Sequence, residues 1–181
     1  MASRHPTWDP EEDAMPTFEP LRPSDALRAR VLASAQSGSR FEGFVGRFAR
    51  IFDLPEERSR EILGAGHTVP GQGWVGTPLP GLHLYHFSGG PRVATADCGL
   101  VHLAAGTAFP LHRHLGREWN FILAGQLENS SGDSWLPGDL VINETGTEHH
   151  YRAGDAEPLL VAVVLEAGIE ILIGAPPEPA R

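Results

Sequence analysis

The part of this chain best suited to chemistry is a short segment that holds two histidines and a glutamate. His112 and His114 are separated by one residue, and Glu118 follows the second histidine by four residues. Alternate side chains of an extended strand point to the same face, so these three side chains are expected to face one way. Imidazole nitrogens and carboxylate oxygens are ligands of divalent transition metals. The segment therefore predicts part of a metal site.

A fourth candidate ligand, His149, lies in a second segment, where Gly138 and Gly146 mark a strand, a turn and another strand. The full set would then be three neutral imidazoles and one carboxylate, which leaves a divalent ion with a net charge of about +1. Zinc, iron, manganese and nickel all accept such ligands, and affinity order alone does not choose among them. An ion with an open position would act as a Lewis acid, whereas a closed shell would serve structure or sensing.

The same alternation predicts which residues surround the ligands. Asn120 and Ala124 share the parity of Glu118 and are expected inside, and Tyr151 shares the parity of His149. Asn120 and Tyr151 are therefore candidates to contact the metal ligands rather than the ion, and Asn120 is able to hold a ligand by a hydrogen bond.

The remaining histidines of the β-rich part give weaker patterns. His150 has the opposite parity to its neighbour and is interpreted as a surface residue. His83 and His86 cannot share a face, and neither has an evident partner. His102 lies on a segment in which apolar and polar residues alternate, and its side chain could face the interior of the barrel. Because the pairing register is unknown, a structural role is favoured.

Two kinds of segment must position these residues, and the first is helical. Residues 24–66 predict a helical extension, with a capped start at Ser24 and a further helix from Pro55 to Gly64. An apolar stripe lies between these two helical stretches. Such a stripe either binds a partner or packs on the body of the protein or across a homodimer, and packing is favoured. The apolar stripe between these helices comprises Phe41, Phe44, Val45, Phe48, Ile51 and Phe52.

From residue 67 to residue 174 the pattern is that of short strands. Glycine and proline interrupt runs rich in β-branched and aromatic residues, which indicates an all-β barrel or sandwich. The predicted strands span residues 81–87, 92–103, 118–127, 139–143, 158–166 and 168–173.

Composition sets limits on the class of protein. The chain has 181 residues, of which 41% are hydrophobic and 20% charged, as in ordinary globular domains. A net charge of −9 argues against nucleic acid as a partner. The only cysteine is Cys98, and the longest apolar run is too short to span a bilayer, so no membrane partner and a cytoplasmic location are expected. Residues 1–23 read as a flexible acidic arm and residues 175–181 as a proline-rich tail.

The spacing of both segments resembles the two signature motifs of the cupin superfamily. The first matches at every fixed position from Gly106 to Gly125. The second departs twice, with Glu144 in place of the usual proline and Ala153 in place of the usual asparagine. The resemblance implies a double-stranded β-helix, or jelly-roll barrel, with one metal held by His112, His114, Glu118 and His149.

A closer resemblance links the chain to the ChrR-type cupins over residues 24–173. It rests on Leu27–Ala33, Phe48–Pro55, His112–Glu118 and Gly168–Leu172. ChrR proteins are zinc-dependent anti-sigma factors of bacterial stress responses, in which the cupin half senses an oxidative signal. The resemblance therefore favours zinc and implies a regulatory or sensory role.

One departure concerns the sigma factor. The family's N-terminal half holds a separate zinc through histidine and cysteine, whereas this chain has no cysteine and only His5 among its first 65 residues. Sigma-factor binding is therefore only weakly implied. The alternative is a metal-dependent dioxygenase or another cupin enzyme with a small-molecule ligand in its barrel, and a purely structural metal barrel is a third possibility.

Overall fold

The computed structural model describes residues 39–172. The helix expected from Ser24, the acidic arm and the tail from residue 175 lie outside the described residues. Within the described part, no helix has the length and apolar character needed to cross a membrane. The elements are η1 (Ser39–Phe44), α2 (Val45–Phe52), α3 (Glu56–Ala65), β1 (Val75–Gly76), β2 (Leu82–Phe87), η2 (Pro91–Val93), β3 (Asp97–Leu103), β4 (Ala108–His114), β5 (Glu118–Ala124), β6 (Leu127–Asn129), β7 (Ser134–Trp135), β8 (Leu140–Asn143), β9 (Glu148–Ala153), β10 (Leu159–Leu165) and β11 (Ile169–Ile171).

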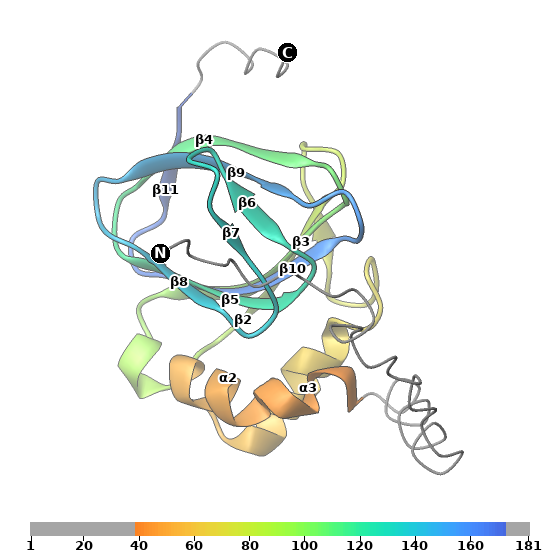
Figure 1. Ribbon diagram of the computed structural model, residues 1–181. Helices are drawn as coiled ribbons and strands as arrows, with labels where there is room; N and C mark the ends of the chain where they lie inside the picture. Colours follow the sequence, from red (N-terminus) through yellow and green to blue (C-terminus); the bar gives the residue numbers. More distant parts are fainter. Residues whose placement is uncertain (1–38, 173–181) are drawn as a thin grey trace, which may run out of the picture.

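Two antiparallel sheets face each other and form the predicted barrel (Figure 1). One sheet has the order β1-β2-β3-β10-β5-β8, and the other has the order β11-β4-β9-β6-β7. Helices α2 and α3 lie against the outer face of the first sheet, below the barrel in Figure 1. The expected all-β jelly roll with an N-terminal helical region is confirmed.

Strand β10 lies in the middle of the first sheet and is apolar on both faces. Leu159, Val161 and Val163 belong to the core between the sheets. Leu160 and Val164 belong to the core beneath the helices. Alternate residues of a strand point to opposite faces, so a strand covered on both sides needs an unbroken apolar run. This explains why the longest apolar run of the sequence is a strand.

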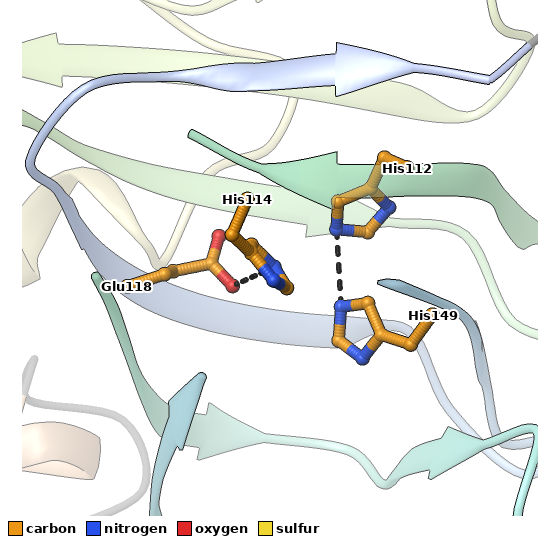
Figure 2. A group of neighbouring side chains, drawn as sticks. All are labelled: His112, His114, Glu118 and His149. Carbon is orange, nitrogen blue, oxygen red and sulfur yellow. Dashed lines mark hydrogen bonds and ion pairs between the residues drawn. The ribbon is translucent and has the colours of Figure 1, made fainter. Parts of the chain in front are cut away.

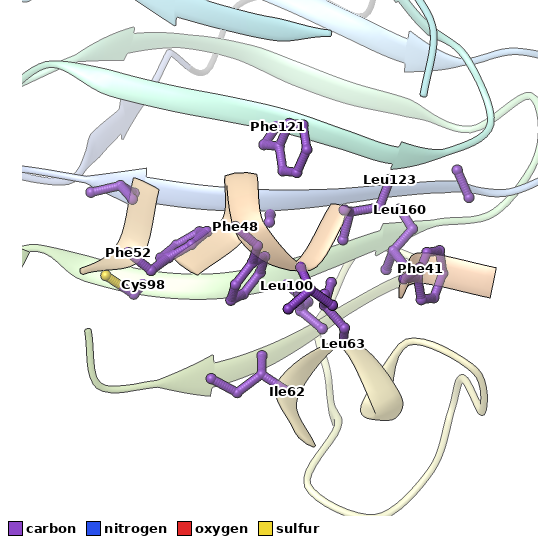
Figure 3. Packing of buried hydrophobic residues seen from close by; sticks show 14 residues of the cluster. Phe41, Phe48, Phe52, Ile62, Leu63, Cys98, Leu100, Phe121, Leu123 and Leu160 are labelled. Carbon is purple, nitrogen blue, oxygen red and sulfur yellow. The ribbon is translucent and has the colours of Figure 1, made fainter. Parts of the chain in front are cut away.

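The aromatic stripe packs on the barrel, as the sequence favours. Phe48 and Phe52 are fully buried, and their ring centroids lie 4.3 Å apart. Phe87 of β2 packs against both rings, and Phe44 meets Phe121 of β5 edge-on with centroids 5.5 Å apart. Figure 3 shows these helices laid across the strands. The helical region and the first sheet therefore share one hydrophobic core.

Three details of the sequence interpretation are wrong. Residues 118–127 are not one strand, because β5 ends at Ala124 and β6 begins at Leu127 in the other sheet. Residues 92–103 are not one strand, because Pro91–Val93 forms a 3-10 turn and the strand begins at Asp97. The backbone N–H and the guanidinium of Arg92 both donate to Asp53, which holds that segment beside the end of α2. Ala124 faces the helices rather than the interior. The cause is a register shift between β10 and β5, which reverses the alternation at this point.

We expect Phe48→Ala to lower the free energy of unfolding by about 3–5 kcal/mol, because it removes a fully buried ring and leaves a cavity. Urea denaturation measures this change. The matched control Glu57→Ala, at an exposed position on α3, should stay within about 0.5 kcal/mol of the parent. Equal stability of the two variants would show that the helices do not share the core of the barrel.

Candidate metal centre

The four predicted ligands meet between the two sheets. His112 and His114 come from β4, His149 from β9 and Glu118 from the first residue of β5. One ligand atom from each residue lies within 4.8 Å of all the others. Figure 2 shows the four side chains pointing toward one another inside the barrel. His112, His114 and Glu118 are buried, and His149 is half-buried.

The backbone explains why these segments converge. His112 and His149 are direct cross-strand partners in the β4–β9 pair. The backbone of His114 is fixed at both ends, since its N–H donates to Thr147 and its carbonyl accepts from the N–H of Gly146. Gly146 has a φ of 82°, a left-handed conformation that glycine adopts without strain. The motif glycine thus makes the turn that brings His149 to the other ligands.

Hydrogen bonds to Nδ1 determine which ring nitrogens face the site. Nδ1 of His112 donates to the carbonyl of Pro110 at 2.9 Å. Nδ1 of His114 lies 2.9 Å from Oγ1 of Thr147, whose own proton goes to the carbonyl of Glu144 at 2.7 Å. A carbonyl only accepts, and the Thr147 hydroxyl has already donated its proton, so both rings carry hydrogen on Nδ1. Their Nε2 atoms therefore present lone pairs to the site.

The lone pairs of His114 and Glu118 lie close enough to repel each other without a cation between them. Nε2 of His114 is buried, has no hydrogen-bond partner in the described part of the chain and lies 3.2 Å from Oε2 of Glu118. We take this distance as a close approach rather than a hydrogen bond, since both atoms carry lone pairs. Nε2 of His149 lies 3.0 Å from Nε2 of His112. Such a donor set fits a single divalent transition metal.

Two asparagines orient the carboxylate. Nδ2 of Asn120 donates to Oε2 of Glu118 at 2.6 Å, and Nδ2 of Asn143 donates to the same oxygen at 2.8 Å. Asn120 is where the alternation places it. Asn143 was missed, because it reaches Glu118 through the β5–β8 register, which the sequence does not specify. Thr147 was missed for a similar reason, since it acts through the ring of His114.

The protonation states suit metal binding at neutral pH. Burial lowers the pKa of His112, and burial together with the neighbouring histidines lowers the pKa of His149 to about 4. Burial by itself would raise the pKa of Glu118. Hydrogen bonds from the amides of Asn120 and Asn143 favour the ionised form, and the pKa of Glu118 lies below its ordinary value. His112 and His149 are therefore neutral and the Glu118 carboxylate is ionised at neutral pH, which are the ligand forms a metal requires.

An apolar cavity of about 250 Å³ opens onto two of the candidate ligands, His112 and Glu118. Tyr151, the other predicted neighbour, lines this cavity and stacks on Phe109 with ring centroids 5.0 Å apart. Its ring lies 5.8 Å from that of His149. Burial, with the charge of Glu118, raises the pKa of the Tyr151 phenol, so it stays protonated. Tyr151 therefore faces whatever occupies the cavity.

The other histidines and the cysteine lie apart from this cluster. His86 pairs with Asp97 at 3.0 Å, and both residues line the cavity. His83 lies directly across from His102 on the neighbouring strand. Cys98 is buried, and burial raises the pKa of its thiol, so it behaves as a small apolar residue.

Two antiparallel sheets closed around an interior His₃Glu cluster define a cupin-type barrel. More specifically, the chain belongs to the ChrR Cupin-like domain family, whose profile matches residues 73–167. This match confirms the ChrR-like cupin predicted from the motifs.

Individual relatives are more distant. A protein of Cereibacter sphaeroides assigned as a dimethylsulfoniopropionate lyase, DddL, is 35% identical over 65 residues, which are 35% of this chain and 28% of that protein. The chain thus matches less than a third of that relative's length.

Two solved structures illustrate the range of similar folds. The complex of Rhodobacter sphaeroides SigE with the anti-sigma factor ChrR matches with 19% identity and a TM-score of 0.49, over 86% of this chain and 74% of the matched chain. An acetylacetone dioxygenase of Acinetobacter johnsonii matches with 16% identity and a TM-score of 0.48, over 58% and 75% respectively.

We predict that His149→Ala sharply lowers metal content, because it removes one of four converging ligands. Elemental analysis of purified protein measures the metal. His150→Ala is the matched control, since this neighbouring residue lies outside the ligand cluster, and it should keep the parent content. Full metal in His149→Ala would remove this residue from the ligand set.

Asn143→Ala should weaken metal binding by about 10- to 100-fold, because Glu118 loses one of the two donors that orient it. Competition with a chelator of known affinity measures the change. Asn129→Ala serves as the control, since this asparagine lies in the β6–β7 hairpin and is not among the clustered ligands. Unchanged affinity in Asn143→Ala would show that Asn120 alone orients the carboxylate.

The pKa of His149 predicts how pH affects the metal-free protein. The folded chain resists protonation of His149 until about pH 4, whereas the unfolded chain takes up that proton near pH 6.5. The contribution of His149 to stability is therefore complete above pH 6.5 and is lost as the pH falls toward 4. Urea unfolding of chelator-treated protein across this range should show a weaker pH dependence in His149→Gln. Identical pH profiles would contradict the lowered pKa.

Proposed function

We propose that this protein is a single-metal cupin of the ChrR type that binds a small molecule beside its metal and has a sensory or regulatory role. The observation that carries the proposal is the apolar cavity of about 250 Å³ that reaches His112 and Glu118. His112, His114, Glu118 and His149 would hold the ion, with zinc favoured by the family. When bound, the ion supplies a Lewis-acid centre to which a donor atom of the small molecule coordinates.

The construction of the first sheet supports a sensory role. Glu118 lies in the interior, while the next residue, Trp119, packs against the core beneath the helices. Val163 lines the cavity, and Val164 belongs to the helical core. A shift of β5 or β10 that follows ligand binding is therefore transmitted to α2 and α3, because a strand moves both of its faces together.

A metal-dependent enzyme is the second candidate, and the accessible cavity favours it. Tyr151 and the His86–Asp97 pair supply polar groups within a mainly apolar wall. Such a cavity suits a small organic substrate with one donor atom at the ion. A dioxygenase or a lyase are the two activities that the relatives' names suggest.

Macromolecular partners are also proposals. A sigma factor is consistent with family membership, although the chain lacks the cysteine-containing zinc module. A homodimer is supported by exposed apolar side chains on neighbouring strands, Leu111 of β4 and Ile171 of β11. Mass measurement in solution tests the dimer, and co-purification with co-expressed sigma factors tests the other partner.

We expect purified protein to contain zinc and to consume no oxygen with a diketone, a thiol or an aromatic acid. Elemental analysis and an oxygen electrode test this directly. Iron at full occupancy together with oxygen consumption would overturn the sensory proposal in favour of the enzyme.

Access to the ion can be tested with the cobalt-substituted protein and acetylacetone, which has two donor oxygens and an apolar body. We expect its addition to change the visible spectrum of the parent. Val163→Phe should abolish the change without loss of cobalt, because the larger ring fills the cavity. Ile142→Phe, at an exposed position on β8, is the control and should behave as the parent. A full spectral response in Val163→Phe would show that this cavity is not the route to the ion.

A further inference from the structure

The cavity beside the candidate metal centre also has a pair of polar side chains at its rim. His86 of β2 and Asp97 of β3 line the same cavity as His112 and Glu118. Nδ1 of His86 lies 3.0 Å from Oδ1 of Asp97, and both side chains are exposed to solvent. Polar groups outside the candidate ligand set therefore face the same space as the ligands.

The strand register fixes how far this pair lies from the candidate ligands. Asp97 is the cross-strand partner of Leu165 on β10, and Leu165 is in turn the partner of Glu118 on β5. Side chains that lie directly opposite each other share a face, so the three residues form one row on the interior face of the sheet. Neighbouring strands lie about 4.8 Å apart, which places the Cα atoms of Asp97 and Glu118 about 10 Å apart.

The cavity between these two ends is apolar. Leu165 separates Asp97 from Glu118 in their row, and Gly99 and Val163 are partners in the next row. All three of these intervening residues line the cavity, and Gly99 has no side chain to fill it. Among the described residues that line the cavity, none is a lysine or an arginine. The middle of the cavity therefore suits an apolar body, and its outer end has no cationic side chain of this kind for an anion.

The outer end of the cavity offers hydrogen-bond acceptors. A carboxylate only accepts, so the proton shared by the pair is on Nδ1 of His86. This bond uses Oδ1 of Asp97, and Oδ2 still has lone pairs for a second donor. In a neutral imidazole the other ring nitrogen, Nε2, is an acceptor as well. A group placed here is therefore bound best if it donates a hydrogen bond, as an ammonium or a hydroxyl group does.

The inner end of the cavity favours the opposite kind of group. A divalent ion held by three neutral imidazoles and one carboxylate would keep a net charge of about +1. An anionic donor atom, such as a carboxylate oxygen, is attracted to such a charge more strongly than a neutral one. The two ends of the cavity therefore differ in the chemistry that they bind.

We infer that the cavity selects small molecules with a carboxylate at one end, an apolar body, and an ammonium or hydroxyl group at the other end. This inference rests on the function proposed above, because it requires a small molecule that reaches the ion. Asp97 receives the distal donor group, and the N–H of His86 holds the Asp97 carboxylate in place. The two residues determine specificity and take no part in holding the ion.

Three unbranched six-carbon acids test this selectivity. Each has one carboxylate for the ion, and they differ at the other end, which is an ammonium in 6-aminohexanoate, a methyl in hexanoate and a second carboxylate in adipate. Each acid is titrated into the cobalt-substituted full chain and followed by the visible spectrum. We expect 6-aminohexanoate to bind about 5- to 10-fold more tightly than hexanoate, because it adds one charge-assisted hydrogen bond at an exposed site. Adipate should bind more weakly than hexanoate, because its second carboxylate meets that of Asp97.

The variant Asp97→Asn keeps the size of the side chain and removes its charge. The affinity for 6-aminohexanoate should fall to that for hexanoate, and the affinity for hexanoate should not change. Glu170→Gln on β11 is the matched control, since it removes the same charge from an exposed residue that does not line the cavity. This control should keep the preference of the parent. Cobalt content equal to that of the parent shows that each variant has folded around an intact centre.

The possible failures are distinguishable. Equal affinities for 6-aminohexanoate and hexanoate in the parent would overturn this inference and leave the function proposed above standing, because a small molecule would still reach the ion. The inference also fails if Asp97→Asn retains the preference or if Glu170→Gln loses it. The absence of any spectral change with all three acids would overturn both the inference and the proposed function.

Discussion

The interior of this barrel depends on four side chains, three imidazoles and one carboxylate, whose donor atoms lie within 4.8 Å of one another. Hydrogen bonds to the backbone and to Thr147 direct the Nε2 lone pairs of His112 and His114 inward. Asn120 and Asn143 hold the Glu118 carboxylate against them. The fold therefore holds these donor atoms in place before a cation binds. A bound cation would relieve the repulsion between the imidazole and carboxylate lone pairs. Pre-organisation of this kind is how proteins obtain tight and selective metal sites.

The support for these donors comes from irregular parts of the strands as much as from regular ones. Pro110 lies where the β4–β9 register shifts, so its carbonyl is free to accept from His112. A proline is tolerated at such a position because it has no N–H to offer the ladder. The turn at Gly146 similarly holds the backbone of His114. Breaks in the sheet are therefore used to orient ligands and not only to end strands.

Sequence reasoning identified the four converging residues because their spacing resembles the two cupin motifs. Local alternation accounts only for His112 and His114, since Glu118 begins a strand of the other sheet and His149 lies on β9. The helical spacing of apolar residues indicated α2 and α3 and favoured packing of the aromatic stripe on the body of the protein. Sequence reasoning failed at Ala124, where a register shift reverses the alternation. It also missed Asn143 and the pairing of His83 with His102. Those contacts depend on which residues of distant strands lie opposite each other, and nothing in a single sequence fixes that register.

The division of the ligands between the two sheets has a mechanical consequence. His112, His114 and His149 come from one sheet, and Glu118 begins a strand of the other. An ion bound to all four would act as a clamp across the mouth of the barrel. Separation of the sheets at this end would then require rupture of coordination bonds in addition to loss of apolar contacts. Metal binding would therefore make opening of the barrel slower and rarer, because the bound ion crosslinks the two sheets.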